Sequence, residues 1–204
     1  IDKVFWDLEA FHKKDKKVVT FTPGDCEFGY RQSVFKEKFK DQFVILNVTF
    51  QLRKKPRFNT SYGAIEQELE RMGVRELSLK AISAAVINIR TSKLPNPVEI
   101  GNAGSFFKNP TIPLEQFLRI QKEYPEMPNY PNGDLVKVPA GWLIEQCGWK
   151  GKQIGNVASH KLQALVIVNA TGEASGEEIF DFSTLIIDSV KEKFGIELER
   201  EGNI

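Results

Sequence analysis

Residues 101–110 are GNAGSFFKNP, a run in which two glycines precede a hydroxyl, two aromatic rings, a cation and an amide. Gly101 and Gly104 allow tight turns and close approach of the backbone to a ligand. Small residues followed by two adjacent aromatics do not form an ordinary amphipathic helix, so this stretch is expected to form the wall of a site. Ser105 is the group in it that could move a proton, although a serine beside glycines is more often a turn residue.

The composition is that of a water-soluble globular chain. The 28 Lys and Arg residues and 27 Asp and Glu residues give a formal charge of +1, which predicts no general attraction to nucleic acid or to an anionic membrane. Cys26 and Cys147 are far apart and there are only two histidines, so no zinc site or disulfide framework is expected. Unpaired cysteines favour a reducing, cytoplasmic location.

Hydrophobic patterning predicts both strands and helices. The predicted strands are Val4–Leu8, Val18–Phe21, Phe43–Phe50, Ala164–Val168 and Ile196–Glu201. The predicted helices are Tyr62–Met72, one capped by Ser78 and stopped before Pro95, one after Pro113, Ala140–Cys147 and Glu177–Phe194. This order indicates an α/β or α+β architecture.

Several side chains have both an ordinary and a functional interpretation. Arg31 could be a surface residue or could clamp a carboxylate with two parallel hydrogen bonds. Lys93 and Lys150 are solvated lysines by default, but each lies in a sequence typical of a ligand-contacting loop. Trp142 and Trp149 are expected to anchor the core. The residues alone therefore predict a cytosolic domain with an anion-binding cleft.

Six segments, taken together and in this order, resemble the UDP-N-acetylenolpyruvoylglucosamine reductase family. They are residues 28–33 (FGYRQS), 90–95 (RTSKLP), 101–110, 128–131 (PNYP), 140–147 (AGWLIEQC) and 198–201 (LERE). The resemblance implies an α+β fold, in which residues 1–94 are the rear part of a flavin-binding domain and residues 95–194 are an α/β substrate-binding domain. Residues 195–204 would form a terminal strand that returns to the flavin region. Most flavin contacts are expected from an N-terminal region that this chain does not contain.

The resemblance also implies a reaction. NADPH reduces FAD, which then delivers hydride to the enolpyruvyl group of UDP-N-acetylglucosamine enolpyruvate. Arg31 and Glu201 would stabilise the resulting enolate, and Ser105 would protonate its α-carbon. The residues expected to contact the nucleotide sugar are Tyr62, Lys93, Asn109, Tyr130, Lys150 and Gln163. A cytoplasmic monomer with no nucleic acid, membrane or metal partner is expected.

One position departs from the family pattern, and two other functions remain open. Gly202 follows Glu201 where a β-branched residue is expected, and glycine loosens a strand by roughly 1 kcal/mol. The first alternative is an isolated fragment that acts only as a UDP-sugar-binding module. The second is a flavin oxidase of the same two-domain fold, which the GNAGSFFKNP stretch disfavours.

Overall fold

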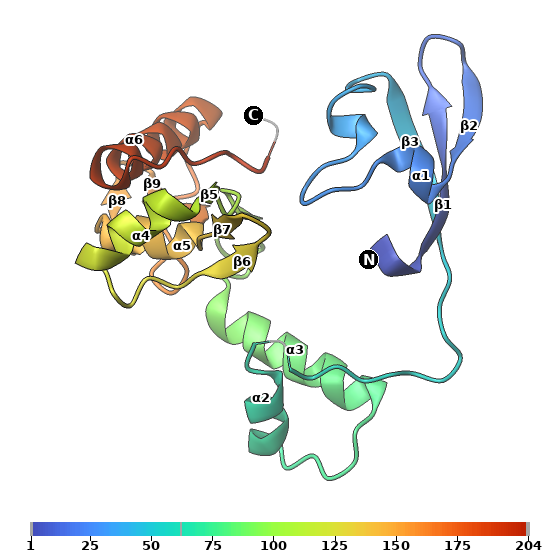
Figure 1. The fold of residues 1–204 in the computed structure, drawn as a ribbon, viewed down its shortest axis with the longest axis horizontal. Helices are drawn as coiled ribbons and strands as arrows, with labels where there is room; N and C mark the ends of the chain where they lie inside the picture. The colour runs from blue at the N-terminus through green and yellow to red at the C-terminus, as the bar shows by residue number, and fades with distance from the viewer. Residues whose placement is uncertain (1, 62, 203–204) are drawn as a thin grey trace. The chain divides into compact units, whose positions relative to one another are not determined.

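A computed structural model describes residues 2–61 and 63–202 (Figure 1). Its contacts divide the chain into two compact units, one from Ile1 to Phe58 and the other from Asn59 to Ile204. Helices and antiparallel strands occur in both units, so the predicted α+β class is confirmed. The domain boundary that the resemblance places at residues 94 and 95 is a different division, and it stays a prediction.

The first unit is a three-stranded antiparallel sheet closed by short helical turns. Its strands are β1 (Phe5–His12), β2 (Lys17–Phe21) and β3 (Phe43–Phe50), in the order β2-β1-β3. The helix α1 (Pro23–Cys26) and 3-10 turns at Asp2–Val4 and Val34–Lys36 complete it. One face is covered by aromatic side chains that pack edge-to-face, an arrangement favoured by the ring quadrupole: Phe21, Phe35, Phe39 and Phe43.

The second unit contains the remaining helices. These are α2 (Ile65–Arg71), α3 (Leu79–Lys93), α4 (Leu114–Glu123), α5 (Ala140–Gln146) and α6 (Gly176–Phe194). Ser78 caps α3 as predicted, because its hydroxyl accepts a hydrogen bond from the Ala81 amide at 3.1 Å. Ser175 and Glu178 form a capping box at the start of α6, and Gly195 ends that helix in the left-handed conformation.

Two small sheets pack with α4, α5 and α6, whereas α2 packs on α3. The first has the order β4-β10-β9-β8, with β4 (Asn102–Ser105), β10 (Val166–Asn169), β9 (Val157–Ser159) and β8 (Gln153–Ile154). The second has the order β5-β7-β6, with β5 (Thr111–Pro113), β7 (Leu135–Lys137) and β6 (Tyr130–Asn132). A single large core joins them, and Trp149 is buried in it while Trp142 packs against it, as predicted.

The C-terminal segment is less regular than the sequence predicts. In place of a strand over Ile196–Glu201, the described residues form one isolated bridge between Phe107 and Arg200. Two backbone hydrogen bonds flank this bridge, and Pro110 has no amide hydrogen with which to extend it. The bridge pairs the segment with the stretch that follows Ser105, which brings Arg200 and Glu201 next to that stretch.

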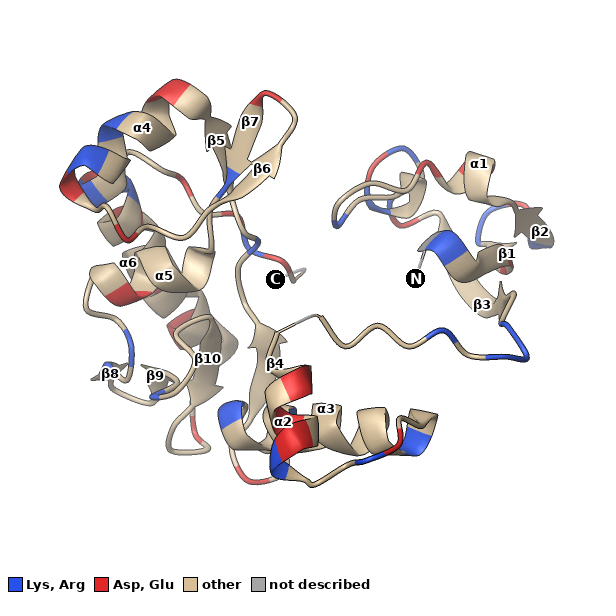
Figure 2. Cartoon of the chain, turned by 60° about the horizontal axis from the view of Figure 1, so that its bottom comes forward, with Lys and Arg blue, Asp and Glu red and all other residues tan. Residues whose placement is uncertain are grey.

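Charged residues are dispersed. Acidic and basic side chains both lie along α4 (Figure 2). Within the described part of the chain, no helix combines the length and apolar character needed to cross a bilayer.

Candidate functional site

Ser105 lies at the end of β4, beside a β-bulge. Its pairing partner on β10 is Val166, whereas Asn102 pairs with Val168, so one extra residue is accommodated on β4. Gly104 takes a φ of +75°, which favours glycine, and its amide donates to the Asn102 side-chain oxygen at 3.1 Å. Directly paired residues share a face of the sheet, so the bulge puts Ser105 on the face of Val166. The side chain of Ser105 is exposed there.

Glu201 lies next to the same stretch. Its amide donates to the Phe106 carbonyl at 2.9 Å, and the Lys108 amide donates to the Glu199 carbonyl at 2.8 Å. The Lys108 and Glu199 side chains also form an ion pair. Two of the three predicted catalytic residues, Ser105 and Glu201, therefore lie on paired neighbouring segments.

The third predicted catalytic residue, Arg31, belongs to the first unit. Gly29 and Gln32 exchange two backbone hydrogen bonds of 3.0 and 3.2 Å, so Tyr30 and Arg31 form the tip of a tight turn. Arg31 has a φ of +59°, a conformation that costs a non-glycine residue about 1 kcal/mol or more. Such strained residues cluster at functional sites, and local residue patterns do not indicate the strain at Arg31.

An open cavity of about 590 Å³ brings together two of the predicted nucleotide contacts, Lys93 from the end of α3 and Tyr130 from β6. Ser61 and Gly63, which flank Tyr62 in the sequence, line the same cavity. Tyr62 itself lies outside the described residues. The cavity size falls in the range of small-molecule sites.

The other three predicted nucleotide contacts gather around α5. Asn109 accepts a hydrogen bond from the Ala140 amide at 2.9 Å, and so satisfies the first backbone donor of that helix. The side-chain oxygen of Gln163 faces Gly141, where a β-carbon would come within 3.6 Å of it. Lys150 forms an ion pair with Glu145 at 2.7 Å near the end of the helix. Asn109 and Lys150 thus have partners within the chain, and the ligand role of all three residues stays a prediction.

A second cavity, of about 710 Å³, is lined by residues of two of the quoted segments and by His160, which the sequence analysis did not single out. Asn102 and Gly104 of β4 line it, as does Arg90, which also lines the first cavity. His160 contributes a buried Nδ1 that has no hydrogen-bond partner among the described residues. Burial and the neighbouring Lys161 lower the pKa of His160, so its ring is neutral at pH 7. His160 has no other histidine, cysteine or acidic residue near it in the sequence, so residue patterns alone do not predict this cavity.

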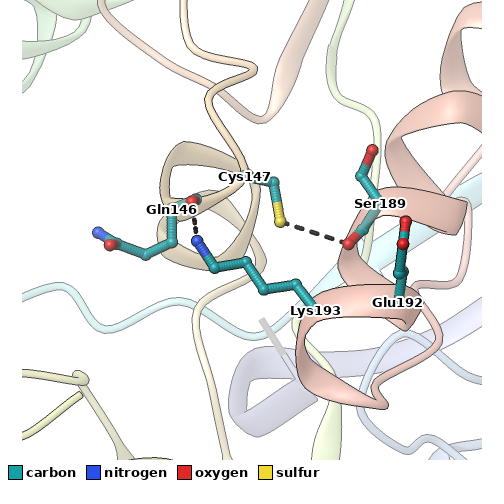
Figure 3. Close-up of a pocket in the computed structure, with 5 residues that line it drawn as sticks. All are labelled: Gln146, Cys147, Ser189, Glu192 and Lys193. Carbon is teal, nitrogen blue, oxygen red and sulfur yellow. Dashed lines mark hydrogen bonds between the residues drawn. The ribbon is translucent and has the colours of Figure 1, made fainter. Parts of the chain in front are cut away.

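A third, smaller pocket lies between α5 and α6 (Figure 3). Lys193 donates to the Gln146 carbonyl at 2.6 Å, and the Cys147 thiol donates to the Ser189 carbonyl at 3.6 Å. Burial raises the pKa of the Cys147 thiol, so the unreactive protonated form predominates at neutral pH. None of the predicted site residues lines this pocket. Within residues 2–61 and 63–202, no group of three or more His, Cys, Asp or Glu side chains could hold a metal ion.

Comparison with known proteins supports the resemblance. Residues 96–204 match a family described as UDP-N-acetylenolpyruvoylglucosamine reductase, C-terminal domain. Proteins named UDP-N-acetylenolpyruvoylglucosamine reductase from Flavobacterium johnsoniae and Pseudomonas putida are 48% and 43% identical to the chain over its whole length. The chain spans only 61% and 60% of these two relatives.

A solved structure shows the same fold at lower sequence similarity. The crystal structure of UDP-N-acetylenolpyruvylglucosamine reductase from Thermus caldophilus aligns with 99% of this chain and 53% of its own, with a TM-score of 0.57. The sequence identity is 20%, so this match supports the fold alone.

Proposed function

This chain belongs to the UDP-N-acetylenolpyruvoylglucosamine reductase family, and we propose that the full-length protein reduces UDP-N-acetylglucosamine enolpyruvate to UDP-N-acetylmuramate for peptidoglycan synthesis. The observation that carries the proposal is the position of Arg90, which lines both large cavities. One cavity contains Lys93 and Tyr130, and the other is bounded by residues of β4 next to Ser105. This position of Arg90 supports a site in which Lys93 and Tyr130 contact the nucleotide near the strand that carries Ser105.

The first cavity suits the nucleotide part of the substrate. Lys93 provides an ammonium group for the diphosphate, and Arg90 a guanidinium that can form two parallel hydrogen bonds. Tyr130 offers an aromatic face and a hydroxyl. Asn109 can contribute its Nδ2 donor while its oxygen stays on α5, because Nδ2 makes no hydrogen bond within the described residues. We also assign Tyr62, Lys150 and Gln163 to the nucleotide-sugar contacts.

Ser105 is proposed to protonate the carbon that carries the carboxylate. Reduction adds a hydride to the methylene carbon and a proton to the neighbouring carbon, so one carbon–carbon double bond is consumed and no other bond breaks. Negative charge spreads onto the carboxylate between the two additions. A fixed cation and hydrogen-bond donors lower the energy of that state, and we assign this role to Arg31 and Glu201. Glu201 can donate a hydrogen bond only in its protonated form.

FAD, reduced by NADPH, would supply the hydride when bound. The second cavity fits a polar part of such a cofactor, because the buried Nδ1 of His160 has no partner among the described residues and Arg90 lines the same cavity. We therefore propose that Arg90 and His160 are contacts that this chain offers to the flavin nucleotide. We further propose that the full-length protein is a cytoplasmic monomer.

The proposal is tested by following the two half-reactions in the full-length protein. NADPH should bleach the flavin absorbance, and the enolpyruvyl nucleotide sugar should then restore it and yield a product two hydrogens heavier by mass spectrometry. Failure of the enolpyruvyl sugar to reoxidise the flavin would contradict the proposed reaction. Sugar binding with no flavin uptake would instead support the binding module.

A further inference from the structure

Arg200, the residue before Glu201, is held by a cradle on α6 formed by Phe180, Ser183 and Thr184. Its Nε donates to the Ser183 hydroxyl at 2.8 Å, and one terminal nitrogen donates to the Thr184 hydroxyl at 2.6 Å. The same nitrogen reaches the Phe180 carbonyl at 3.4 Å. The guanidinium also lies over the Phe180 ring, 4.2 Å from its centre, within the range of a cation–π interaction.

The cradle matches a guanidinium because of how its hydroxyls are used. Ser183 donates its hydroxyl hydrogen to the Phe180 carbonyl at 2.6 Å, and Thr184 donates to the same carbonyl at 3.0 Å. Both oxygens therefore present lone pairs to Arg200. Ser183 is completely buried. If the Arg200 side chain were removed, the Ser183 oxygen would lose the hydrogen bond that it accepts, and water could not replace it. A planar guanidinium can donate to both hydroxyls while it stacks on the Phe180 ring. The ammonium group of a lysine lacks this planar geometry.

The other polar side-chain ties of this segment are more exposed, whereas Ile196 and Leu198, which are 2% and 3% exposed, anchor its earlier part in the core. Lys191 and Glu197 form an ion pair at 2.8 Å, but their side chains are 60% and 69% exposed. Glu199, which pairs with Lys108, is 70% exposed. Exposed ion pairs contribute little to stability because water and salt screen them. Next to Glu201, Arg200 is thus the residue whose side chain is tied to α6 by several hydrogen bonds.

This tie acts at the place where Glu201 is aligned. Arg200 pairs with Phe107, which is almost completely buried, and the flanking backbone hydrogen bonds run from Glu201 to Phe106 and from Lys108 to Glu199. Side chains alternate along an extended chain, so the attachment of Arg200 to α6 turns Glu201 to the opposite side. Gly202, which follows Glu201, has no side chain that could pack against its neighbours.

We propose that Arg200 is a positioning residue: its attachment to the cradle on α6 fixes the register of Glu201 beside the segment of Ser105. The inference rests on the proposed function for the chemical role of Glu201, but the alignment itself can be measured without any activity. Arg200 acts through Glu201 and is not proposed to touch the substrate.

The first test measures amide hydrogen exchange in the full-length protein with Arg200→Met, Arg200→Lys and the control Lys191→Met. Arg200→Met should speed exchange at the Glu201 and Lys108 amides by about tenfold or more, while the amides of α4 stay unchanged. Arg200→Lys should restore protection only in part, because lysine keeps the charge but loses the planar geometry. Lys191→Met removes an exposed tie of the same segment and should leave exchange unchanged. Unchanged protection in Arg200→Met would overturn the proposal.

The second test separates positioning from general stability. Arg200→Met should lower the rate of flavin reoxidation by the enolpyruvyl sugar about 10- to 100-fold, the loss expected when a reacting group is misplaced by about 1 Å. Flavin reduction by NADPH should keep its wild-type rate. Equal losses in both half-reactions would indicate a merely structural residue and refute positioning. If the wild type itself shows no reoxidation, the proposed function fails, while the exchange result still decides the alignment.

If the Arg200→Met variant does not fold, Thr184→Val tests the same attachment with a smaller perturbation. It removes one acceptor of the cradle, keeps the shape of the side chain and leaves Arg200 in place. Faster exchange at the Glu201 amide is expected, and unchanged exchange would contradict the role of the cradle.

Discussion

Asn109 offers a prediction in which stability and binding separate, because its two side-chain atoms have different tasks. The oxygen accepts the Ala140 amide at 2.9 Å at the start of α5, and the nitrogen is proposed to donate to the nucleotide sugar. Asn109→Asp keeps an acceptor for α5 and replaces the donor with a negative charge. Asn109→Ala removes both.

The expected magnitudes follow from these two contacts. Loss of the hydrogen bond at a helix start costs about 1 kcal/mol, so in Asn109→Ala the Ala140 amide should exchange with solvent about fivefold faster. Asn109→Asp should show no such loss, since a carboxylate near a helix N-terminus is stabilising by about 0.3–1 kcal/mol. Both variants should bind the nucleotide sugar about 10-fold to 100-fold more weakly, because a hydrogen bond to a charged ligand contributes about 1.5–3 kcal/mol.

The assay pairs amide hydrogen exchange with calorimetry, using UDP-N-acetylglucosamine enolpyruvate as the probe. Wild-type affinity in Asn109→Asp would refute the ligand role and leave Asn109 as a structural residue of α5. Unchanged exchange of the Ala140 amide in Asn109→Ala would refute the stabilising role of the hydrogen bond.

Three further outcomes are expected. Lys93→Met should weaken UDP binding at least tenfold in calorimetry. The difference in affinity between this variant and the wild type should be smaller at high salt, because salt screens the charge of Lys93. An unchanged affinity would exclude Lys93 from the site. Ser175→Ala should destabilise α6 by about 1 kcal/mol, measured by hydrogen exchange of the Glu178 amide that the hydroxyl accepts at 3.1 Å; unaltered exchange would show that the cap is dispensable. The pKa of His160 is lowered in the folded state, so the unfolded state binds its proton first and stability should fall as pH drops below about 6.5. His160→Gln should flatten that part of the profile in denaturant unfolding, and an identical profile would remove His160 as its cause.

Much of the fold follows from local sequence. The apolar, β-branched run at Phe43–Phe50 forms β3 as predicted, and Ser78 and Gly195 mark helix ends where their chemistry requires them. The C-terminal segment was less predictable, because Ile196–Glu201 has strand-like residues but makes one isolated bridge, Phe107 with Arg200, among the described residues. Whether a segment forms a continuous strand ladder or a single bridge depends on the segment that it pairs with. The local residue pattern carries no information about that partner.

The candidate site was predictable in part. Ser105 and Glu201 were assigned by resemblance, and the backbone pairing of their segments supports their proximity. The cavity with Lys93 and Tyr130 likewise joins residues far apart in the sequence. The strained turn at Arg31 and the unpaired His160 nitrogen could not be predicted, because backbone strain and orphaned atoms arise only from tertiary packing.

The most direct test of the proposed chemistry is single-turnover kinetics of the full-length protein with Ser105→Ala. Flavin reduction by NADPH should proceed at the wild-type rate, while formation of UDP-N-acetylmuramate should be nearly abolished. Product formation at the wild-type rate in this variant would contradict the assignment of Ser105 as the proton donor.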